Sequence, residues 1–493
     1  EPAAHALAMT ASRTTRYRRL QEGGDLDVLV VGGGISGAPV YQKMRLAGYR
    51  VGLVDQGDFS SGTSQTSGML IWGGLLYLTK LDFKTVLKLC KARSDLMRDF
   101  PEDVTSLDLD YRVGIGGNHG AVRAWLALQL YWLMGGCKLR RPRMVKDPSA
   151  VRYQEAMLRE SDSRFVIDRI RGLDSEHGIA LNHCRLVHAD FDPGRRVWNI
   201  GLRDELDGRE HVVRARAIVN AAGVWADSVN RTLGVDSPYK HVFSKGVYLA
   251  FSNEGSERGA DVYPMRQGAD VITRVPWGPV LMWGPTETGV DDLARGLAPD
   301  QQDVRFLLEE AKRNLPGHRM GAEDIVSVRC GVRPLAVPAN FRKDVYPLTL
   351  SRRHRLVTDE TRRAMTIYGG KLTGSLQMAE VVEARLRDWL EPRFPCEPPV
   401  LVAPERAGSH GFVTPEWARD HEFCVTLDDY VRRRTSIAQW TPRMGLGPQG
   451  DGRTALLDVA KKLLMSGDDT AAETMVRAYE ERVRSTYDPL LNL

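Results

Sequence analysis

The regular hydrophobic pattern of the chain begins with a short apolar run at residues 27–31, Asp-Val-Leu-Val-Val. Its β-branched residues predict a buried parallel strand. Three glycines at 32–34 end the run, and apolar residues then recur at helical spacing over 35–46. A second apolar run at 50–55 follows Gly48. We therefore predict a strand–helix–strand unit with parallel strands.

Apolar patterns continue along the rest of the chain. Residues 215–221 form another apolar run that leads into small residues. Strand-like runs recur at 246–251, 270–275 and 280–283, and helical spacing recurs from 164 to near Gly178, over 426–436 and over 454–484. This alternation predicts an α/β fold whose C-terminal part, from about residue 401, is helical.

The turn between the first strand and helix carries Gly32-x-Gly34-x-x-Gly37, and Asp55 ends the second strand. Gly32 allows a tight turn, and Gly34 lets the backbone approach a pyrophosphate at the helix N-terminus. Gly37 permits close contact between helix and strand, and Asp55 is placed to bind a ribose diol. The motif indicates a dinucleotide site and leaves FAD and NAD open.

A polar loop of small residues follows Asp55 and favours FAD. Residues 57–64 read Gly-Asp-Phe-Ser-Ser-Gly-Thr-Ser, and such a loop can follow an extended ligand beyond its ribose. No pattern of a separate nicotinamide domain comes after it. The cofactor-binding candidates outside the glycines and Asp55 are Ser36, Gln56, Thr63 and Ser64.

Several further motifs occur in an order typical of one family. They lie at 31–37, 63–64, 70–78, 220–226, 245–246, 331–335, 368–373 and 426–434. With these segments the chain resembles the FAD-dependent glycerol-3-phosphate dehydrogenases, within the D-amino-acid-oxidase-like flavoproteins. The resemblance implies further FAD contacts at Gly73, Gly74, Ala222, Gly223, Gly370, Lys371, Leu372 and Thr373.

The resemblance also implies a domain arrangement. We expect a Rossmann-type FAD-binding domain of the glutathione-reductase/DAO type, with an inserted antiparallel-sheet substrate domain and a C-terminal helical domain. The expected FAD-binding segments are 25–100, 160–235 and 345–400. The substrate domain is expected at 101–159 and 236–344, the helical domain at 401–493, and an N-terminal extension at 1–24.

The chain departs from the family where the substrate is expected to bind. Met69 and Trp72 stand where Lys and His are usual, Leu76 replaces an arginine, and Tyr248 replaces a histidine expected to help deprotonate an alcohol. After Thr373 the usual Thr-Tyr-Arg reads Gly-Ser-Leu. A phosphate dianion requires several charge-assisted donors, so we expect a different, bulkier substrate.

Some polar residues of the family's pattern remain. We take Tyr248, Lys371 and Arg333 as catalytic candidates, and Arg333, Arg352, Tyr77, Trp72 and Leu76 as the substrate-binding set. Arg333 offers a planar fork for a carboxylate or phosphate. An ion pair between domains for Arg333, a surface position for Lys371 and core packing for Tyr248 and Trp72 are the structural alternatives.

These residues predict an FAD-dependent dehydrogenase or oxidase that takes hydride from a C–H beside a hydroxyl, in a biosynthetic tailoring role. The substrate is expected to be a small anionic or polyhydroxylated molecule, with oxygen or a quinone as electron acceptor. A genuine glycerol-3-phosphate dehydrogenase, an amine or imine oxidase, and a non-catalytic flavin-binding sensory or structural protein stay open.

Composition limits which classes of binding partner are expected. The net charge of +5 and the absence of a dense basic stripe argue against nucleic acid. The six cysteines are scattered without metal-ligand spacing, as in a cytoplasmic protein with neither disulfides nor a metal site. An apolar stretch at 124–134 precedes a basic one at 138–143, so contact with the inner face of a membrane is one interpretation and a buried helix the other. A homodimer also stays open.

Overall fold

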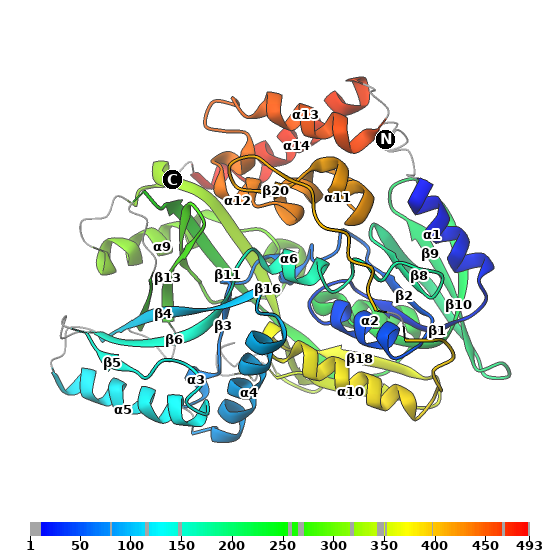
Figure 1. Ribbon diagram of the computed structural model, residues 1–493, viewed down its shortest axis with the longest axis horizontal. Helices are drawn as coiled ribbons and strands as arrows, with labels where there is room; N and C mark the ends of the chain where they lie inside the picture. The colour runs from blue at the N-terminus through cyan, green and yellow to red at the C-terminus, as the bar shows by residue number, and fades with distance from the viewer. Residues whose placement is uncertain are drawn as a thin grey trace.

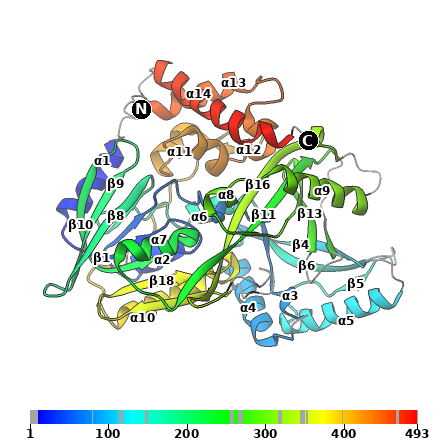
Figure 2. The same ribbon diagram turned by 180° about the vertical axis from the view of Figure 1, so that it is seen from behind.

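The computed structural model describes residues 11–78, 81–113, 118–145, 150–254, 259–264, 271–315, 320–342, 350, 353–396, 398–465 and 469–491. In these residues two large β-sheets lie side by side, and a helical C-terminal part lies above both of them (Figure 1). The second view shows the same arrangement from behind (Figure 2). Each sheet contains strands from several separate parts of the chain, so segments distant in sequence lie side by side.

The first sheet has a parallel centre in the order β18-β10-β1-β2-β7. Its strands are β1 (Leu26–Val31), β2 (Val51–Val54), β7 (Gly178–Leu181), β10 (Glu210–Asn220) and β18 (Ala364–Tyr368). Antiparallel partners extend it: β17 (Arg355–Asp359) pairs with β18, and β8 (Cys184–Asp192) and β9 (Val197–Asp204) continue from β10. Every position of β1, β2 and β7 is buried, because both faces of a parallel sheet are covered.

Helices and a β-meander cover the two faces of this sheet. On one face α2 (Gly37–Leu46) and α10 (Ser375–Arg387) pack side by side, together with α6 (Asp162–Ile167). On the other face α1 (Ala11–Glu22) and α7 (Ala226–Leu233) pack with β8 and β9. The predicted strand–helix–strand unit is confirmed as β1, α2 and β2.

The second sheet is mixed and runs in the order β15-β11-β14-β13-β12-β4-β6-β3, with β16 paired to β11 and β5 to β6. Its strands are β3 (Leu70–Ile71), β4 (Val104–Arg112), β5 (Arg143–Met144), β6 (Ala150–Leu158), β11 (Tyr239–Ser252), β12 (Ala260–Pro264), β13 (Val271–Trp277), β14 (Val280–Gly284), β15 (Thr288–Val290) and β16 (Ile325–Pro338). The strands predicted at 246–251, 270–275 and 280–283 are confirmed in β11, β13 and β14, except that residue 270 lies outside the described residues.

Helices also pack on the second sheet. One side contacts α3 (Leu75–Leu78), α4 (Phe83–Asp99) and α5 (Asn118–Met134), and the other contacts α8 (Leu293–Gly296) and α9 (Gln301–Asn314). The longest pairing joins β11 to β16, with Ser244 opposite Arg333 and Tyr248 opposite Arg329. This ribbon extends from the first sheet to the C-terminal part (Figure 2).

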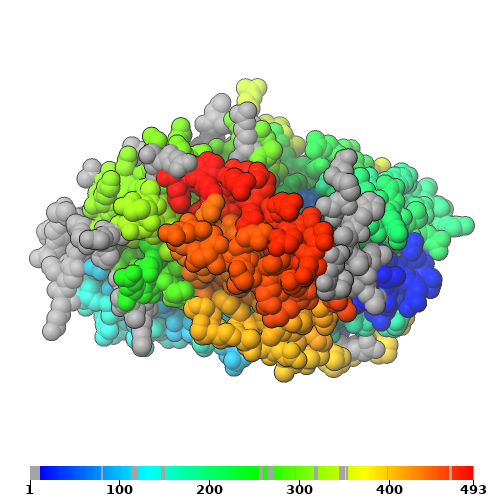
Figure 3. Space-filling view, turned by 90° about the horizontal axis from the view of Figure 1, so that it is seen from above, coloured from blue at the N-terminus to red at the C-terminus, as the bar shows by residue number. Residues whose placement is uncertain are grey.

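The C-terminal part is helical, as predicted. A small hairpin of β19 (Arg406–Ala407) and β20 (Phe412–Val413) precedes α11 (Pro415–His421), a π-helix η7 (Asp429–Arg434), α12 (Ile437–Trp440), the 3-10 helix η8 (Arg443–Gly445), α13 (Arg453–Leu464), α14 (Asp469–Thr486) and α15 (Asp488–Leu491). Seen from above, these orange and red residues occupy the middle of the molecule (Figure 3).

Two sequence-based boundaries are corrected. The helix expected to extend from 164 to near Gly178 is only α6, which ends at Ile167, and Gly172 then adopts a left-handed φ of +78° that no helix continues through. The helix expected over 454–484 is divided into α13 and α14, because Met465 ends α13 in a left-handed conformation. Among the described residues, no helix has the length and apolarity needed to cross a bilayer.

Candidate active site and cofactor cavity

The glycine turn after β1 leaves no room for side chains at two positions. A Cβ on Gly37 would lie 1.8 Å from the backbone oxygen of Gly32, and a Cβ on Gly32 would lie 2.6 Å from that of Ala221. Gly32 also has a φ of +105°, which favours glycine. The first turn of α2 is therefore held directly against the end of the central strands.

Gly34 is different, because it borders open space. A Cβ there would meet only the side chain of Ser64, at 2.9 Å from its Oγ. That hydroxyl accepts a hydrogen bond from the backbone N–H of Ile35 at 2.9 Å. The turn thus presents bare backbone at the N-terminus of α2, which is the arrangement that binds a diphosphate.

Asp55 follows β2 at the same edge of the sheet. Its carboxylate accepts hydrogen bonds from the backbone N–H of Gly33 at 2.7 Å and of Gly57 at 2.9 Å. Burial raises the pKa of Asp55 to about 6, against the opposing effect of these two hydrogen bonds. A buried carboxylate beside the glycine turn is a strong acceptor for the two hydroxyls of a ribose.

A first cavity of about 130 Å³ lies over this edge of the first sheet. It is formed by the glycine turn, the end of β2, the loop after it and the 3-10 helix η3 (Gly223–Trp225). The predicted cofactor residues that line it are Gly32, Gly34, Ser36, Asp55, Gln56, Thr63, Ser64, Ala222, Gly223 and Gly370.

A second cavity of about 280 Å³ continues from the first, and both are lined by Ile35, Thr63, Ser64, Pro334 and Gly370. It lies between the first sheet and the β11–β16 ribbon. The predicted residues that line it, besides those shared with the first cavity, are Trp72, Gly74, Leu76, Tyr77, Tyr248, Arg333, Lys371, Leu372 and Thr373. Two joined cavities of this size suit an extended cofactor with a substrate beside one end.

Arg333 is paired inside the second cavity. Its guanidinium donates to the carboxylate of Glu287 at 2.8 Å, and the Ser244 hydroxyl donates to the other oxygen of the same carboxylate. A Cβ on Gly246 would lie 2.2 Å from the Arg333 guanidinium, so glycine makes room for the arginine on the neighbouring strand. The arginine therefore faces the cavity with a carboxylate already beside it.

The other charged groups of the second cavity also have partners. The Lys371 ammonium lies 4.8 Å from the ring centre of Tyr77, within the range of a cation–π interaction. Asp162 accepts from the Arg329 guanidinium at 2.8 Å and from the backbone N–H of Ser67 at 2.7 Å. Tyr248 is mostly buried and lies against Gly68, where a Cβ would come within 2.2 Å of its hydroxyl oxygen.

Two of the described predicted site residues line neither cavity. Gly37 packs under the glycine turn, and Gly73 packs against Arg93 and Tyr131. Arg352 lies outside the described residues, and the neighbouring Arg353 pairs with Asp82 on the surface.

The sequence reasoning missed Glu287, Asp162 and Trp225, which line the cavities. Trp225 belongs to a motif already noted at 220–226 and could have been included. Glu287 and Asp162 carry no local signal, because only the fold brings their carboxylates to the cavity.

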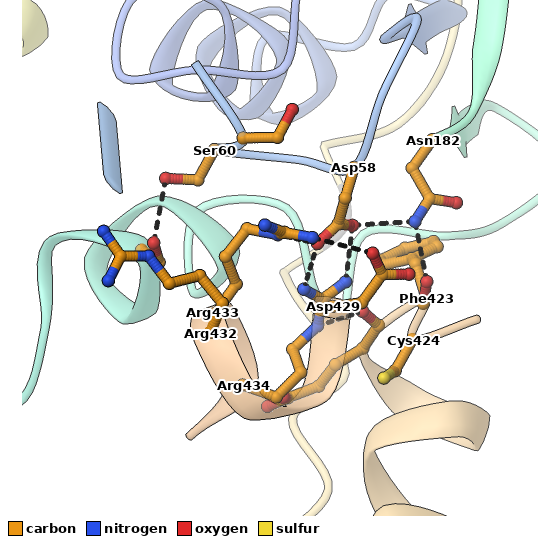
Figure 4. A network of polar contacts seen from close by, with 12 residues as sticks. Asp58, Ser60, Asn182, Phe423, Cys424, Asp429, Arg432, Arg433 and Arg434 are labelled. Carbon is orange, nitrogen blue, oxygen red and sulfur yellow. Dashed lines mark hydrogen bonds and ion pairs between the residues drawn. The ribbon is translucent and has the colours of Figure 1, made fainter. Parts of the chain in front are cut away.

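Asp58, His183 and Asp429 form a cluster with ligand-type atoms within 4.8 Å of one another. Figure 4 shows its two carboxylates beside the arginines of η7. Metal binding is not its best interpretation, since arginines already pair with the carboxylates. Arg434 donates two hydrogen bonds to Asp58 at 2.6 and 2.8 Å, and Arg433 donates to Asp429 at 2.8 Å.

A Rossmann-type sheet, a bare glycine turn and an acid at the end of β2 define a dinucleotide-binding protein. The chain belongs to the FAD-dependent oxidoreductase family, DAO, whose family pattern matches residues 27–370. The predicted cofactor and enzyme class are thereby confirmed: the protein is an FAD-dependent dehydrogenase or oxidase. The residues that line the joined cavities fit FAD, although the role of each one stays a prediction.

Curated relatives and solved structures agree with this assignment. An aerobic glycerol-3-phosphate dehydrogenase of Staphylococcus saprophyticus is 26% identical over 393 residues, or 76% of this chain and 70% of the relative. The FAD-complexed glycerol-3-phosphate dehydrogenase of Bacillus halodurans has a TM-score of 0.72 at 20% identity, over 98% of this chain and 99% of that one. An FAD-bound L-α-glycerophosphate oxidase of Mycoplasma pneumoniae has a TM-score of 0.55 at 14% identity, over 77% of this chain and 100% of that one.

Proposed function

We propose that this enzyme oxidises a C–H bond beside a hydroxyl on a substrate bulkier than glycerol 3-phosphate, in a biosynthetic tailoring role. The observation that carries the proposal is the composition of the second cavity. Its described wall contains Trp72, Leu76 and Tyr248, and its arginine already has a carboxylate partner in Glu287.

The charge balance of this wall favours a substrate with less negative charge than a phosphate dianion. Each charge-assisted hydrogen bond to an anion contributes about 1.5–3 kcal/mol. Among the described lining residues the cations are Arg333 and Lys371, and the carboxylates are Glu287 and Asp162. A bound dianion would therefore lie near carboxylates as well as cations, whereas a polyol or a monoanion tolerates both.

The residues divide the work of binding and proton transfer. When bound, FAD supplies the acceptor for a hydride. Arg333 binds the polar or anionic end of the substrate, and the aromatic wall limits its orientation. Tyr248 orients the reacting hydroxyl and relays its proton, since a phenol acts as an acid or base at hydrogen-bond range. Lys371, held over Tyr77, contributes positive charge beside the cofactor.

The test is anaerobic reduction of the bound flavin, followed as loss of its yellow absorption. We expect polyols or larger hydroxylated anions to bleach it faster than glycerol 3-phosphate. Rapid bleaching by glycerol 3-phosphate would instead assign the activity named for the staphylococcal relative. Bleaching by amino acids alone would point to an amine oxidase, and failure of every alcohol and amine would contradict the proposal altogether.

The electron acceptor is the finer part of the proposal. The α5 surface, defined here as Val122, Leu126, Leu130 and Leu133, forms an exposed apolar row on the outer side of that helix, with Leu126 and Leu133 56% and 58% exposed. Exposed arginines follow at 140, 141 and 143. α5 contacts α3, whose residues line the second cavity.

An apolar row beside cationic side chains suits an anionic bilayer. We infer that the α5 surface rests on the inner face of a membrane, with a quinone as acceptor. The assay is flotation with vesicles of phosphatidylglycerol and phosphatidylcholine. Leu126→Glu with Leu130→Glu should abolish flotation, and Val212→Glu, at an even more exposed apolar position on β10, should not. Wild-type protein that stays in solution would contradict the inference.

A further inference from the structure

The loop at 55–67 has two opposite sides. One side forms the wall of both cavities through Asp55, Thr63 and Ser64. The other side faces the C-terminal part through Asp58, shown in Figure 4, and through Gln65, which contacts Arg433. The loop is also tied to the glycine turn, since the N–H of Ser60 donates to the backbone oxygen of Gly33 at 3.0 Å. A shift of the loop therefore changes the cavity.

Asp58 is the main contact on the outer side. Its carboxylate receives a two-point pair from Arg434, with nitrogen–oxygen distances of 2.6 and 2.8 Å, and a further bond from Arg433 at 2.5 Å. The amide of Asn182 donates to the same carboxylate at 2.8 Å. The side chains of Asp58 and Arg434 are completely buried. A buried carboxylate needs such partners, because its desolvation is otherwise uncompensated.

Gln65 is a second contact. Arg433 donates to its side-chain oxygen at 3.1 Å, and Arg432 donates to its backbone oxygen at 3.3 Å. Arg329 of β16 donates to the same backbone oxygen at 3.0 Å. The Gln65 amide in turn donates to the backbone oxygen of Ser61 at 2.5 Å, inside the loop.

The three arginines come from one buried turn, η7, and have further anchors in the C-terminal part. We call Arg432, Arg433 and Arg434 the arginine cluster. Arg433 also pairs with Asp428 and Asp429, both at 2.8 Å, and Arg434 donates to the backbone oxygen of Glu422 at 2.8 Å. Burial opposes the charge of Arg433 and Arg434, but carboxylates, chiefly Asp428 and Asp58 for Arg433 and Asp58 for Arg434, outweigh it and raise their pKa values, whereas burial lowers the pKa of Arg432 to about 9. The cluster is thus a fixed, charged support from outside the FAD-binding sheet.

We propose that the arginine cluster is a positioning element for FAD: through Asp58 it holds the 55–67 loop in the shape that binds the cofactor. FAD affinity is then coupled to the contact between η7 and Asp58, although the arginine cluster lines neither cavity. The inference rests on the placement of FAD in the joined cavities given above.

The experiment measures the dissociation constant of FAD for the full-length apoprotein, by quenching of flavin fluorescence. Asp58→Asn keeps the shape of the side chain and removes its charge. Arg434→Lys keeps the charge and loses the planar two-point geometry. We expect each to raise the dissociation constant at least tenfold, which corresponds to about 1.4 kcal/mol. The visible circular dichroism of the flavin should change as well, because Thr63 and Ser64 border the cofactor.

Two controls separate positioning from general loss of stability. Val476→Ala, in the core of the C-terminal helices, lowers thermal stability without touching the loop. Gly34→Val fills the cofactor cavity directly. Weak FAD binding in the Asp58 and Arg434 variants, with normal binding in Val476→Ala, supports the proposal.

Equal FAD affinity in wild type, Asp58→Asn and Arg434→Lys would overturn the proposal. Equal weakening of FAD binding in these two variants and in Val476→Ala would overturn it as well. Normal affinity in Gly34→Val would instead show that the cofactor placement itself is wrong. If Asp58→Asn fails to fold by far-UV circular dichroism, the Arg434→Lys result decides alone. Its FAD-induced rise in melting temperature then serves as the second measurement.

Discussion

FAD binding should weaken as the pH falls through about 6, because Asp55 loses its charge. Burial raises the pKa of this carboxyl to about 6. Ribose hydroxyls donate to the ionised form and stabilise it, so binding favours the carboxylate over the acid. The folding stability of the apoprotein depends on pH in the opposite direction. Because the pKa of Asp55 is raised from its ordinary value of 3.8, this group makes folding less favourable as the pH rises from 3.8 toward 6.

The magnitude follows from the ionised fraction. At pH 5, one unit below the pKa, about one carboxyl in eleven is ionised, so the dissociation constant rises about tenfold over its value at pH 7.5. The loss levels off once the neutral acid dominates, because that form still accepts a weaker hydrogen bond. A hydrogen bond to a charged acceptor contributes about 1.5–3 kcal/mol, and one to a neutral acceptor contributes about 0.5–1.5 kcal/mol. This difference limits how far the dissociation constant can rise.

The assay is titration of apoprotein with FAD between pH 5 and 8, with far-UV circular dichroism at each pH to confirm folding. Asp55→Asn is the matched variant, since it is neutral throughout, and it should bind more weakly with little dependence on pH. A wild-type dissociation constant that is unchanged between pH 7.5 and 5 would refute the reasoning. So would an Asp55→Asn variant that retains the wild-type slope.

Three other substitutions test separate parts of the structure. Gly37→Ala places a Cβ 1.8 Å from a backbone oxygen and should yield colourless protein, whereas Gly259→Ala, whose nearest neighbour is 3.8 Å away, should stay yellow. Glu287→Gln removes a negative charge beside Arg333 and should lower the KM for anionic alcohols about tenfold; an unchanged KM would mean that the carboxylate does not face the substrate. Burial opposes protonation of His183, but Asp429 at 3.1 Å outweighs it and raises the pKa of the imidazole. The charged pair therefore stabilises the fold below pH 6.5, and this stabilisation is lost as the pH rises through the raised pKa. His183→Gln should flatten that part of the plot of melting temperature against pH.

The parts of the site that could be predicted from sequence are those determined by local backbone requirements. The positions of Gly32, Gly34 and Asp55 follow from a turn that only glycine can form and from an acid at the end of the next strand. These residues are close together in the sequence, so local backbone geometry determines how they lie relative to one another.

Contacts between distant segments could not be predicted in this way. Glu287 meets Arg333 across 46 positions, and Arg434 meets Asp58 across 376. The spacing of apolar and polar residues along the sequence does not indicate such pairs. A run of three arginines such as 432–434 is typical of solvated surface, yet all three are buried in the π-helix η7. Their partners lie in the loop that follows Asp55, so the fold had to be known before their burial made sense.

The two cavities take much of their walls from different sheets, and this bears on how the proposed enzyme can change. The glycine turn and Asp55 belong to the first sheet, while Tyr248 and Arg333 lie on the β11–β16 ribbon of the second. On β16, Arg333 and Leu335 line only the second cavity, whereas Pro334 lines both, so changes at the first two positions lie away from the glycine turn proposed to receive FAD. On the proposed function, single changes in the ribbon are therefore expected to alter the choice of substrate while the flavin site is kept.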